Sequence, residues 1–84
     1  MTREAVLERI REHLATELEI DPGRIEDGTR FKEDLEVDSL DLVELVVELE
    51  DSYAIRIPDE EAAKLLTVGQ AADFVAAHAA ETEA

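Results

Sequence analysis

The chain has no cysteine, and its only aromatic residues are Phe31, Tyr53 and Phe74. The missing cysteine excludes a disulfide framework and a metal site built from thiolates. Hydrophobic residues nevertheless make up 45% of the 84 residues, which is enough for one small core. Because that core must be built mainly from aliphatic side chains, the composition favours a helical bundle.

Basic residues are also scarce. Lys and Arg number 8 against 23 Asp and Glu, which gives a formal net charge of −15 at pH 7. This charge repels phosphate backbones and attracts basic protein surfaces, so we expect protein partners and no binding of nucleic acid. No apolar run is long enough to span a bilayer, and no secretory leader is recognisable. We therefore expect a monomeric, cytoplasmic protein without membrane insertion.

Hydrophobic spacing and turn residues predict an all-α fold, a four-helix bundle with three longer helices and one short helix. The first helix follows Thr2, and its pattern is ended by Pro22 and Gly23. A long loop over roughly residues 19–37 leads to a second helix over residues 39–53. Five apolar residues of the loop are expected to pin it to the core: Ile20, Ile25, Phe31, Leu35 and Val37.

The rest of the chain is expected to hold the short helix and the last long helix. Pro58 precedes the short helix, which ends near Leu66, and Thr67 can cap the last helix. We expect the bundle to have up-and-down character. The chain is predicted to be a single domain over residues 1–84, with an ordered core over about residues 3–79 and a frayed tail over residues 80–84.

The second helix has two apolar stripes where a minimal bundle helix needs one. A broad stripe is predicted to face the core: Leu42, Leu45, Val46, Leu49 and Tyr53. A second apolar group lies roughly 40° to 100° around the helix from Ser39: Leu40, Val43 and Val47. It adjoins an acidic stripe: Asp41, Glu44, Glu48 and Asp51. Either both apolar stripes are buried in a central helix, or the second is an exposed strip on which a basic partner docks.

Ser39 is the residue of greatest chemical interest, because it begins the second helix between Asp38 and Leu40. No histidine lies near it in the sequence to activate its hydroxyl as a nucleophile. One interpretation is an ordinary N-cap, which contributes about 1 kcal/mol to a helix. The other interpretation is a serine that a separate enzyme modifies.

The sequence around Ser39 resembles the prosthetic-group attachment site of acyl carrier proteins. The resemblance spans nearly the whole chain and is carried by these segments: Glu33–Asp41, Val43–Val46, Leu49–Asp51, Ile57–Ala62 and Thr67–Val68. One departure from the family pattern is that Glu36 and Val37 stand where the family often has glycine.

In that family a separate transferase attaches 4'-phosphopantetheine from coenzyme A to the serine hydroxyl, which would be Ser39 here. The thiol of this arm holds the acyl group as a thioester, which suits a chain without cysteine. The implied partners have basic docking surfaces and include the phosphopantetheinyl transferase, a ketosynthase and an acyltransferase. The implied docking residues are acidic or apolar: Asp38, Leu40, Asp41, Val43, Glu44, Val47, Glu48, Glu50 and Asp51.

Small aliphatic side chains can part to admit an acyl chain between helices. Six residues are candidates to border such a space: Phe31, Val46, Leu49, Leu65, Leu66 and Ala71. No catalytic residue and no metal site is predicted. A calcium loop with Gly28 at its sixth position fails, because Gly23 and Ile25 would then have to be ligands.

The predicted function is that of a discrete acyl carrier protein, which presents a thioester to successive enzymes and catalyses no reaction itself. Fatty acid biosynthesis is the first choice, because the segment Ile57–Ala62 resembles those carriers most closely. A polyketide carrier and a peptidyl or aminoacyl carrier are alternatives. An acidic interaction protein that mimics nucleic acid is an alternative from a different class, but it has no reason to keep Ser39 beside an apolar strip.

Overall fold

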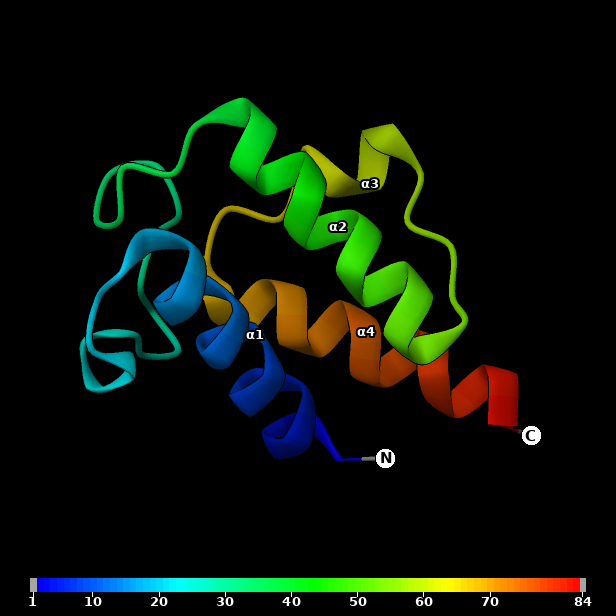
Figure 1. Cartoon of the computed structure of the whole chain (residues 1–84). Coiled ribbons are helices and arrows are strands. Elements are labelled where there is room, and N and C mark those ends of the chain that lie inside the picture. The colour runs from blue at the N-terminus through cyan, green and yellow to red at the C-terminus, as the bar shows by residue number, and fades with distance from the viewer. Residues whose placement is uncertain (1, 84) are drawn as a thin grey trace.

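The computed structural model of the chain describes residues 2–83, with the side chains of residues 2–79. Its elements, shown in Figure 1, are α1 (Arg3–Leu18), the 3-10 turn η1 (Pro22–Arg24), α2 (Ser39–Tyr53), α3 (Asp59–Ala62) and α4 (Val68–Glu83). The predicted all-α class, with three longer helices and one short helix, is confirmed. α4 is described as far as Glu83, but the side chains of residues 80–83 and the whole of Ala84 lie outside the described residues. The frayed tail predicted over residues 80–84 therefore stays a prediction.

Each long helix begins at a side-chain cap. Thr2 Oγ1 accepts a backbone hydrogen bond at the start of α1 (3.1 Å), and Asp38 Oδ1 accepts one from Asp41 at the start of α2 (2.9 Å). Before α4, Thr67 Oγ1 accepts from the Gln70 N–H (3.2 Å), and Gln70 Oε1 accepts in return from the Thr67 N–H (3.0 Å). These caps satisfy N–H groups that have no partner within the helix, so the predicted helix starts are correct.

Two long helices end in a left-handed residue. Glu19 follows α1 with φ 53°, and Ala54 follows α2 with φ 53°. The first helix therefore stops at Leu18, before the Pro22 and Gly23 pair that was predicted to end it. The pair opens the turn η1 instead. The reason is local geometry, because a left-handed residue turns the chain off the helix axis.

The loop between α1 and α2 is long but is held by the rest of the fold. Ile25, Phe31 and Val37 are buried, and the other two predicted anchors pack against the core. The loop backbone also pairs with the segment before α4. The Phe31 N–H donates to Leu66 O (3.1 Å), and the Val68 N–H donates to a loop carbonyl (2.9 Å). The prediction that the loop is pinned is confirmed.

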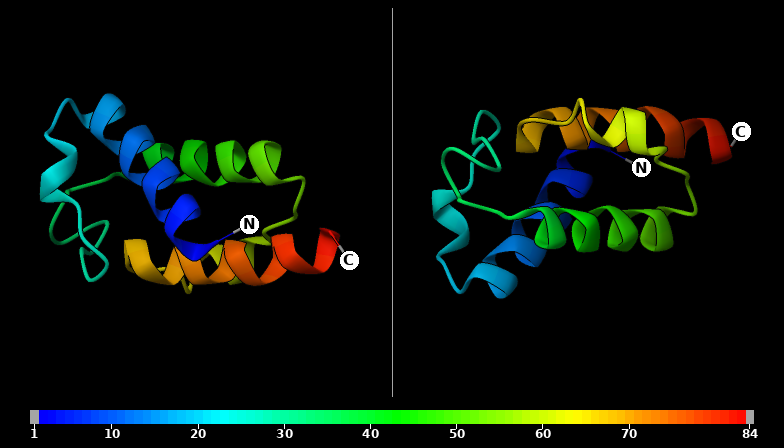
Figure 2. Two further views of the ribbon diagram at one scale, coloured as in Figure 1. Left: turned by 90° about the horizontal axis from the view of Figure 1, so that it is seen from below. Right: turned by 90° about the horizontal axis from the view of Figure 1, so that it is seen from above.

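The helix directions differ from the up-and-down bundle that was expected. α2 and α4 run in the same direction and α1 runs against both, as the views in Figures 1 and 2 show. A helix of 15 residues is about 22 Å long. The partly extended segment Ala54–Thr67 covers this distance and returns the chain to the end at which α2 began. The expectation was wrong because periodicity carries no information on helix direction.

The short helix is also shorter than expected, since α3 ends at Ala62 and not near Leu66. Beyond it the hydrogen bonds are of the tighter 3-10 type, from the Lys64 N–H to Glu61 O (3.0 Å) and from the Leu65 N–H to Ala62 O (3.1 Å). The carbonyl of Leu66 pairs with the loop between α1 and α2. The chain beyond Ala62 thus continues as tight turns, which end the α-helix before Leu66.

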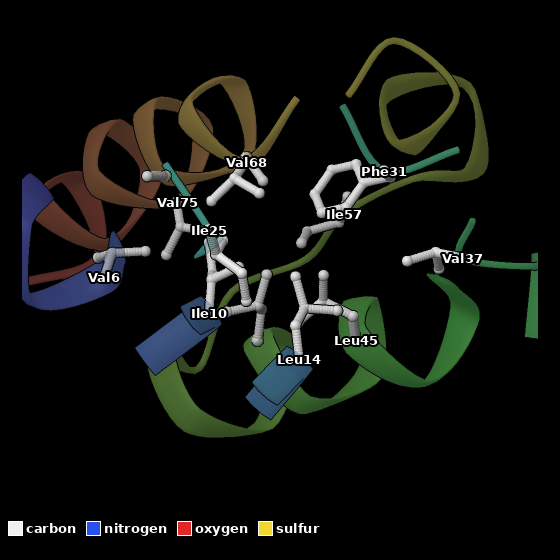
Figure 3. Packing of buried hydrophobic residues seen from close by; sticks show 13 residues of the cluster. Val6, Ile10, Leu14, Ile25, Phe31, Val37, Leu45, Ile57, Val68 and Val75 are labelled. Atoms are coloured by element: carbon white, nitrogen blue, oxygen red, sulfur yellow. The ribbon is translucent and has the colours of Figure 1, made fainter. Parts of the chain in front are cut away.

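The core brings the three long helices and the loop together. Figure 3 shows Val6, Ile10 and Leu14 of α1 beside Leu45 of α2 and Val75 of α4. The buried face of α4 is the predicted one: Val68, Ala71, Ala72, Val75 and Ala79. Within residues 2–83 no helix is both long enough and apolar enough to cross a bilayer.

Candidate functional site

Ser39 is the first residue of α2, and its side chain is exposed. The N-cap is Asp38, whose carboxylate accepts the Asp41 N–H. The interpretation of Ser39 as the N-cap is therefore wrong. Among the described residues no hydrogen bond involves the Ser39 hydroxyl. The hydroxyl is thus accessible and is not needed by the helix.

The apolar strip beside Ser39 is exposed. Leu40, Val43 and Val47 have 67%, 58% and 48% of their surface accessible, whereas Leu45 and Leu49 on the core side have 1% each. The alternative in which α2 is central and both stripes are buried is therefore wrong. Exposed aliphatic side chains grouped on one helix face are typical of a surface that another molecule covers.

A groove of about 810 Å³ lies next to this strip. One wall is α2 and comprises Ser39, Leu42, Val43, Val46, Val47 and Glu50. The other wall comes from the segment around α3 and comprises Arg56, Ile57, Pro58, Asp59, Ala62 and Ala63. Since Ser39 begins α2, the groove has this serine at one end and extends along the helix to Glu50.

The six residues predicted to border an acyl space do not surround a single cavity. Val46 lines the groove. Phe31, Leu65 and Leu66 line a smaller cavity of about 160 Å³. Leu49 and Ala71 are packed in the core, 1% and 2% exposed, and line neither space. The role of all six residues toward an acyl chain stays a prediction.

Sequence reasoning missed the second wall of the groove. That wall begins at Arg56, which lies between Ile55 and Ile57. Ile57 is buried and Ile55 packs against the core, while Arg56 is exposed. The alternation of apolar and charged residues at these positions was the available signal, because inward neighbours leave the middle side chain facing out.

The predicted docking carboxylates of α2 differ in their surroundings. Glu48 faces α1, where its Oε1 lies 3.8 Å from Arg9 Nη1. Glu50 faces the groove, and its Oε2 accepts the Ile57 N–H at 2.7 Å. Asp51 and Glu44 are exposed. Glu48 and Glu50 thus have partners inside the chain, as does Glu44. The contact of any of these carboxylates with another protein stays a prediction.

Glu44 meets a second carboxyl group at the junction of α1 and α2. A hydrogen bond to the Glu17 carboxyl, followed by repulsion from its charge, raises the pKa of Glu44 above its ordinary value. Asp41 adds to the repulsion, and His13 acts in the opposite direction. The acidic field is therefore strong beside the N-terminal half of α2, where a cationic group of another protein would relieve it.

The residues at the start of α2 fit a phosphate-linked arm. A phosphodiester on Ser39 would lie at a helix N-terminus, where unpaired N–H groups and the helix dipole favour an anion. Asp38 and Asp41 oppose it with like charge. The exposed hydroxyl and the open groove next to it leave room for a flexible chain.

Comparisons with known proteins show the family of the chain. A family profile described as a phosphopantetheine attachment site matches residues 8–75. The acyl carrier protein of Rubrobacter xylanophilus is 49% identical over 78 residues, which cover 93% of this chain and 96% of that protein. The acyl carrier protein of Lactobacillus acidophilus is 40% identical over 78 residues, which cover 93% of this chain and 98% of that protein.

A solved structure leads to the same family. The acyl carrier protein of Enterococcus faecalis superposes on this chain with a TM-score of 0.81 at 37% sequence identity. The match covers 93% of this chain and 99% of that chain. The chain is therefore a member of the acyl carrier protein family, with phosphopantetheine as its prosthetic group.

Proposed function

We propose that the chain carries acyl groups as thioesters on a 4'-phosphopantetheine arm attached to Ser39 and presents them to enzymes of fatty acid biosynthesis. It is a protein-bound substrate of those enzymes and catalyses no reaction itself. The observation that supports Ser39 most strongly is its exposed hydroxyl, which the helix cap leaves unused because Asp38 supplies the cap. Cytoplasmic localisation remains the prediction made from the sequence.

The partners that we propose are the phosphopantetheinyl transferase, a ketosynthase and an acyltransferase. The transferase must reach the Ser39 hydroxyl and the other two enzymes must reach the end of the arm, so all three must approach the start of α2. The exposed strip of Leu40, Val43 and Val47 offers an apolar contact there, and the neighbouring carboxylates attract a basic surface. The strip and the charges together favour brief, salt-sensitive association.

Loading of the arm tests the site directly. The chain is incubated with coenzyme A and a promiscuous phosphopantetheinyl transferase, and the product is measured by intact-mass and peptide mass spectrometry. We expect a gain of one phosphopantetheine, located on Ser39. The variant Ser39→Ala should gain nothing, while the control Ser52→Ala, on the same helix, should load like the original chain. Loading of Ser39→Ala would refute the assignment.

The docking strip is tested with the same transferase. If Val43 is a hot spot at the centre of this interface, Val43→Ser should lower kcat/KM for loading by about tenfold, because truncating a hot-spot side chain costs more than about 1 kcal/mol. Ala77→Ser, at an exposed position on α4, is the matched control and should leave the rate unchanged. Both variants should melt like the original chain. An unchanged rate for Val43→Ser would remove this residue from the docking surface.

The pathway is tested by reconstitution. The loaded chain is given malonyl groups and the purified elongation enzymes of fatty acid synthesis. Formation of saturated acyl chains on the arm supports the fatty-acid role. A chain that accepts the arm but is not elongated would instead point to a polyketide or peptidyl system.

A further inference from the structure

Arg56 is an exposed cation at the far end of the groove from Ser39. The Arg56 side chain points away from the core, because its neighbours point into it: Ile57 is 4% exposed and Ile55 packs against the core. No salt bridge found among residues 2–83 involves Arg56. The guanidinium is therefore placed in the groove by packing and keeps its hydrogen-bond donors for another group.

The length of the groove matches the length of the arm. On the α2 wall, Ser39 and Glu50 are separated by about 16 Å of helix rise. The arm has thirteen consecutive bonds from phosphorus to sulfur, and at the spacing of an extended backbone these bonds span about 15 Å. An extended arm that starts at Ser39 and follows the groove therefore brings its thiol beside Glu50 and Arg56.

We propose that Arg56 is a positioning residue for the thiol of the unloaded arm, which reaches the far end of the groove when the arm extends along it from Ser39. This inference rests on the proposed function, because Ser39 must first carry the arm. The apolar walls suit the methyl and methylene groups of the arm, and the charged end suits the thiol. The occupant is thus the arm itself, in preference to an acyl chain or a side chain of a partner enzyme.

The charges around the groove give Arg56 a chemical role. Ionisation of a thiol yields the thiolate that accepts an acyl group, and a nearby cation favours the thiolate. Glu50 and Asp59 line the same groove and oppose ionisation, as does the net charge of −15. Glu50 is held by the Ile57 N–H at 2.7 Å and so stays at the wall. Arg56 is the cation that offsets these carboxylates at the thiol.

The test measures the pKa of the arm's thiol in the phosphopantetheine-loaded full chain, from the ultraviolet absorbance of the thiolate as a function of pH. Arg56→Gln should raise this pKa by about half to one pH unit, as expected for removal of one charge a few ångströms away. Arg56→Lys should restore most of the original value. Arg24→Gln removes the same charge from an exposed position outside the groove and should leave the pKa nearly unchanged.

Two results would overturn the inference. Equal shifts in Arg56→Gln and Arg24→Gln would show that only total charge matters, and no shift in either would place the thiol away from Arg56. A second measurement compares backbone amide chemical shifts before and after loading. Shifts at Ile57 and Ala62 support the groove as the arm's position, and shifts confined to residues next to Ser39 contradict it.

The mass spectrum of each sample separates this inference from the proposed function. A chain that gains no phosphopantetheine refutes both. A chain that gains the arm but shows neither the local pKa effect nor the amide shifts refutes only the position of the arm. Because Arg56 is exposed, Arg56→Gln should fold normally, which a thermal melt verifies.

Discussion

Gly69 packs so closely against Asp27 that no side chain fits at position 69. The Gly69 N–H donates to Asp27 O at 2.8 Å, and a Cβ on Gly69 would collide with the Asp27 carboxylate and lie 3.0 Å from Arg3 Nη2. The Arg3 guanidinium in turn donates to the side chains of Asp27 and Asp73. This junction joins the start of α1, the loop and the start of α4.

Gly69→Ala should therefore destabilise the chain by about 1–3 kcal/mol, the usual cost of overpacking. Helix propensity alone predicts the opposite sign, because alanine is the better helix former. Gly28→Ala is the control, since a Cβ there has no neighbour within 4 Å. It should be neutral or slightly stabilising. Urea unfolding of both variants measures the change in the free energy of unfolding. Equal changes for Gly69→Ala and Gly28→Ala would contradict the close approach of Gly69 to Asp27.

Ala54→Gly should stabilise the chain by up to about 1 kcal/mol, because a left-handed backbone strains any residue with a Cβ. Ala54 has φ 53° at the end of α2. The matched control is Ala63→Gly at the end of α3, where φ is −63°. There the change should destabilise by about 0.5–1 kcal/mol, because glycine loses more entropy on folding. Opposite signs in urea unfolding are the expected result.

The two apolar stripes of α2 should respond differently to truncation. Leu45→Ala removes a side chain that is 1% exposed and should cost about 2–5 kcal/mol. Val47→Ala truncates a side chain that is 48% exposed and should change the free energy of unfolding by less than about 0.5 kcal/mol. A large loss for Val47→Ala would mean that the strip is covered.

Glu44→Gln should make the chain more stable at pH 7. The pKa of Glu44 is raised, first by the hydrogen bond to Glu17 and then by repulsion, so folding favours the protonated form. The original chain therefore loses stability as the pH rises through this raised pKa, and the variant does not. Below about pH 4 both side chains are neutral, and the difference should vanish.

Thermal melts between about pH 3 and pH 8 measure this difference. Glu60→Gln, on α3, is the control for the change in net charge. The same pH-dependent gain in both variants would show that the effect is a general response to charge and not a property of the Glu17 and Glu44 pair.

Much of the candidate site could be predicted because its signals are local. The wheel of α2 separates Val43 and Val47 from the core stripe, and the structure exposes both. The choice between Asp38 and Ser39 as the N-cap of α2 required the backbone conformation seen in the structure, because either side chain suits that position. The groove needed the tertiary structure, since its second wall comes from the segment that follows α2 and folds back alongside it.

The amino-acid sequence by itself determined where the long helices begin and which faces they bury, because caps and periodicity act within a few residues of one chain segment. Only the tertiary structure decided that α2 and α4 run in the same direction and that a groove lies between α2 and the segment around α3. These features depend on contacts between residues far apart in the chain, such as Phe31 with Leu66 and Gly69 with Asp27. Such contacts leave no periodic trace in the sequence.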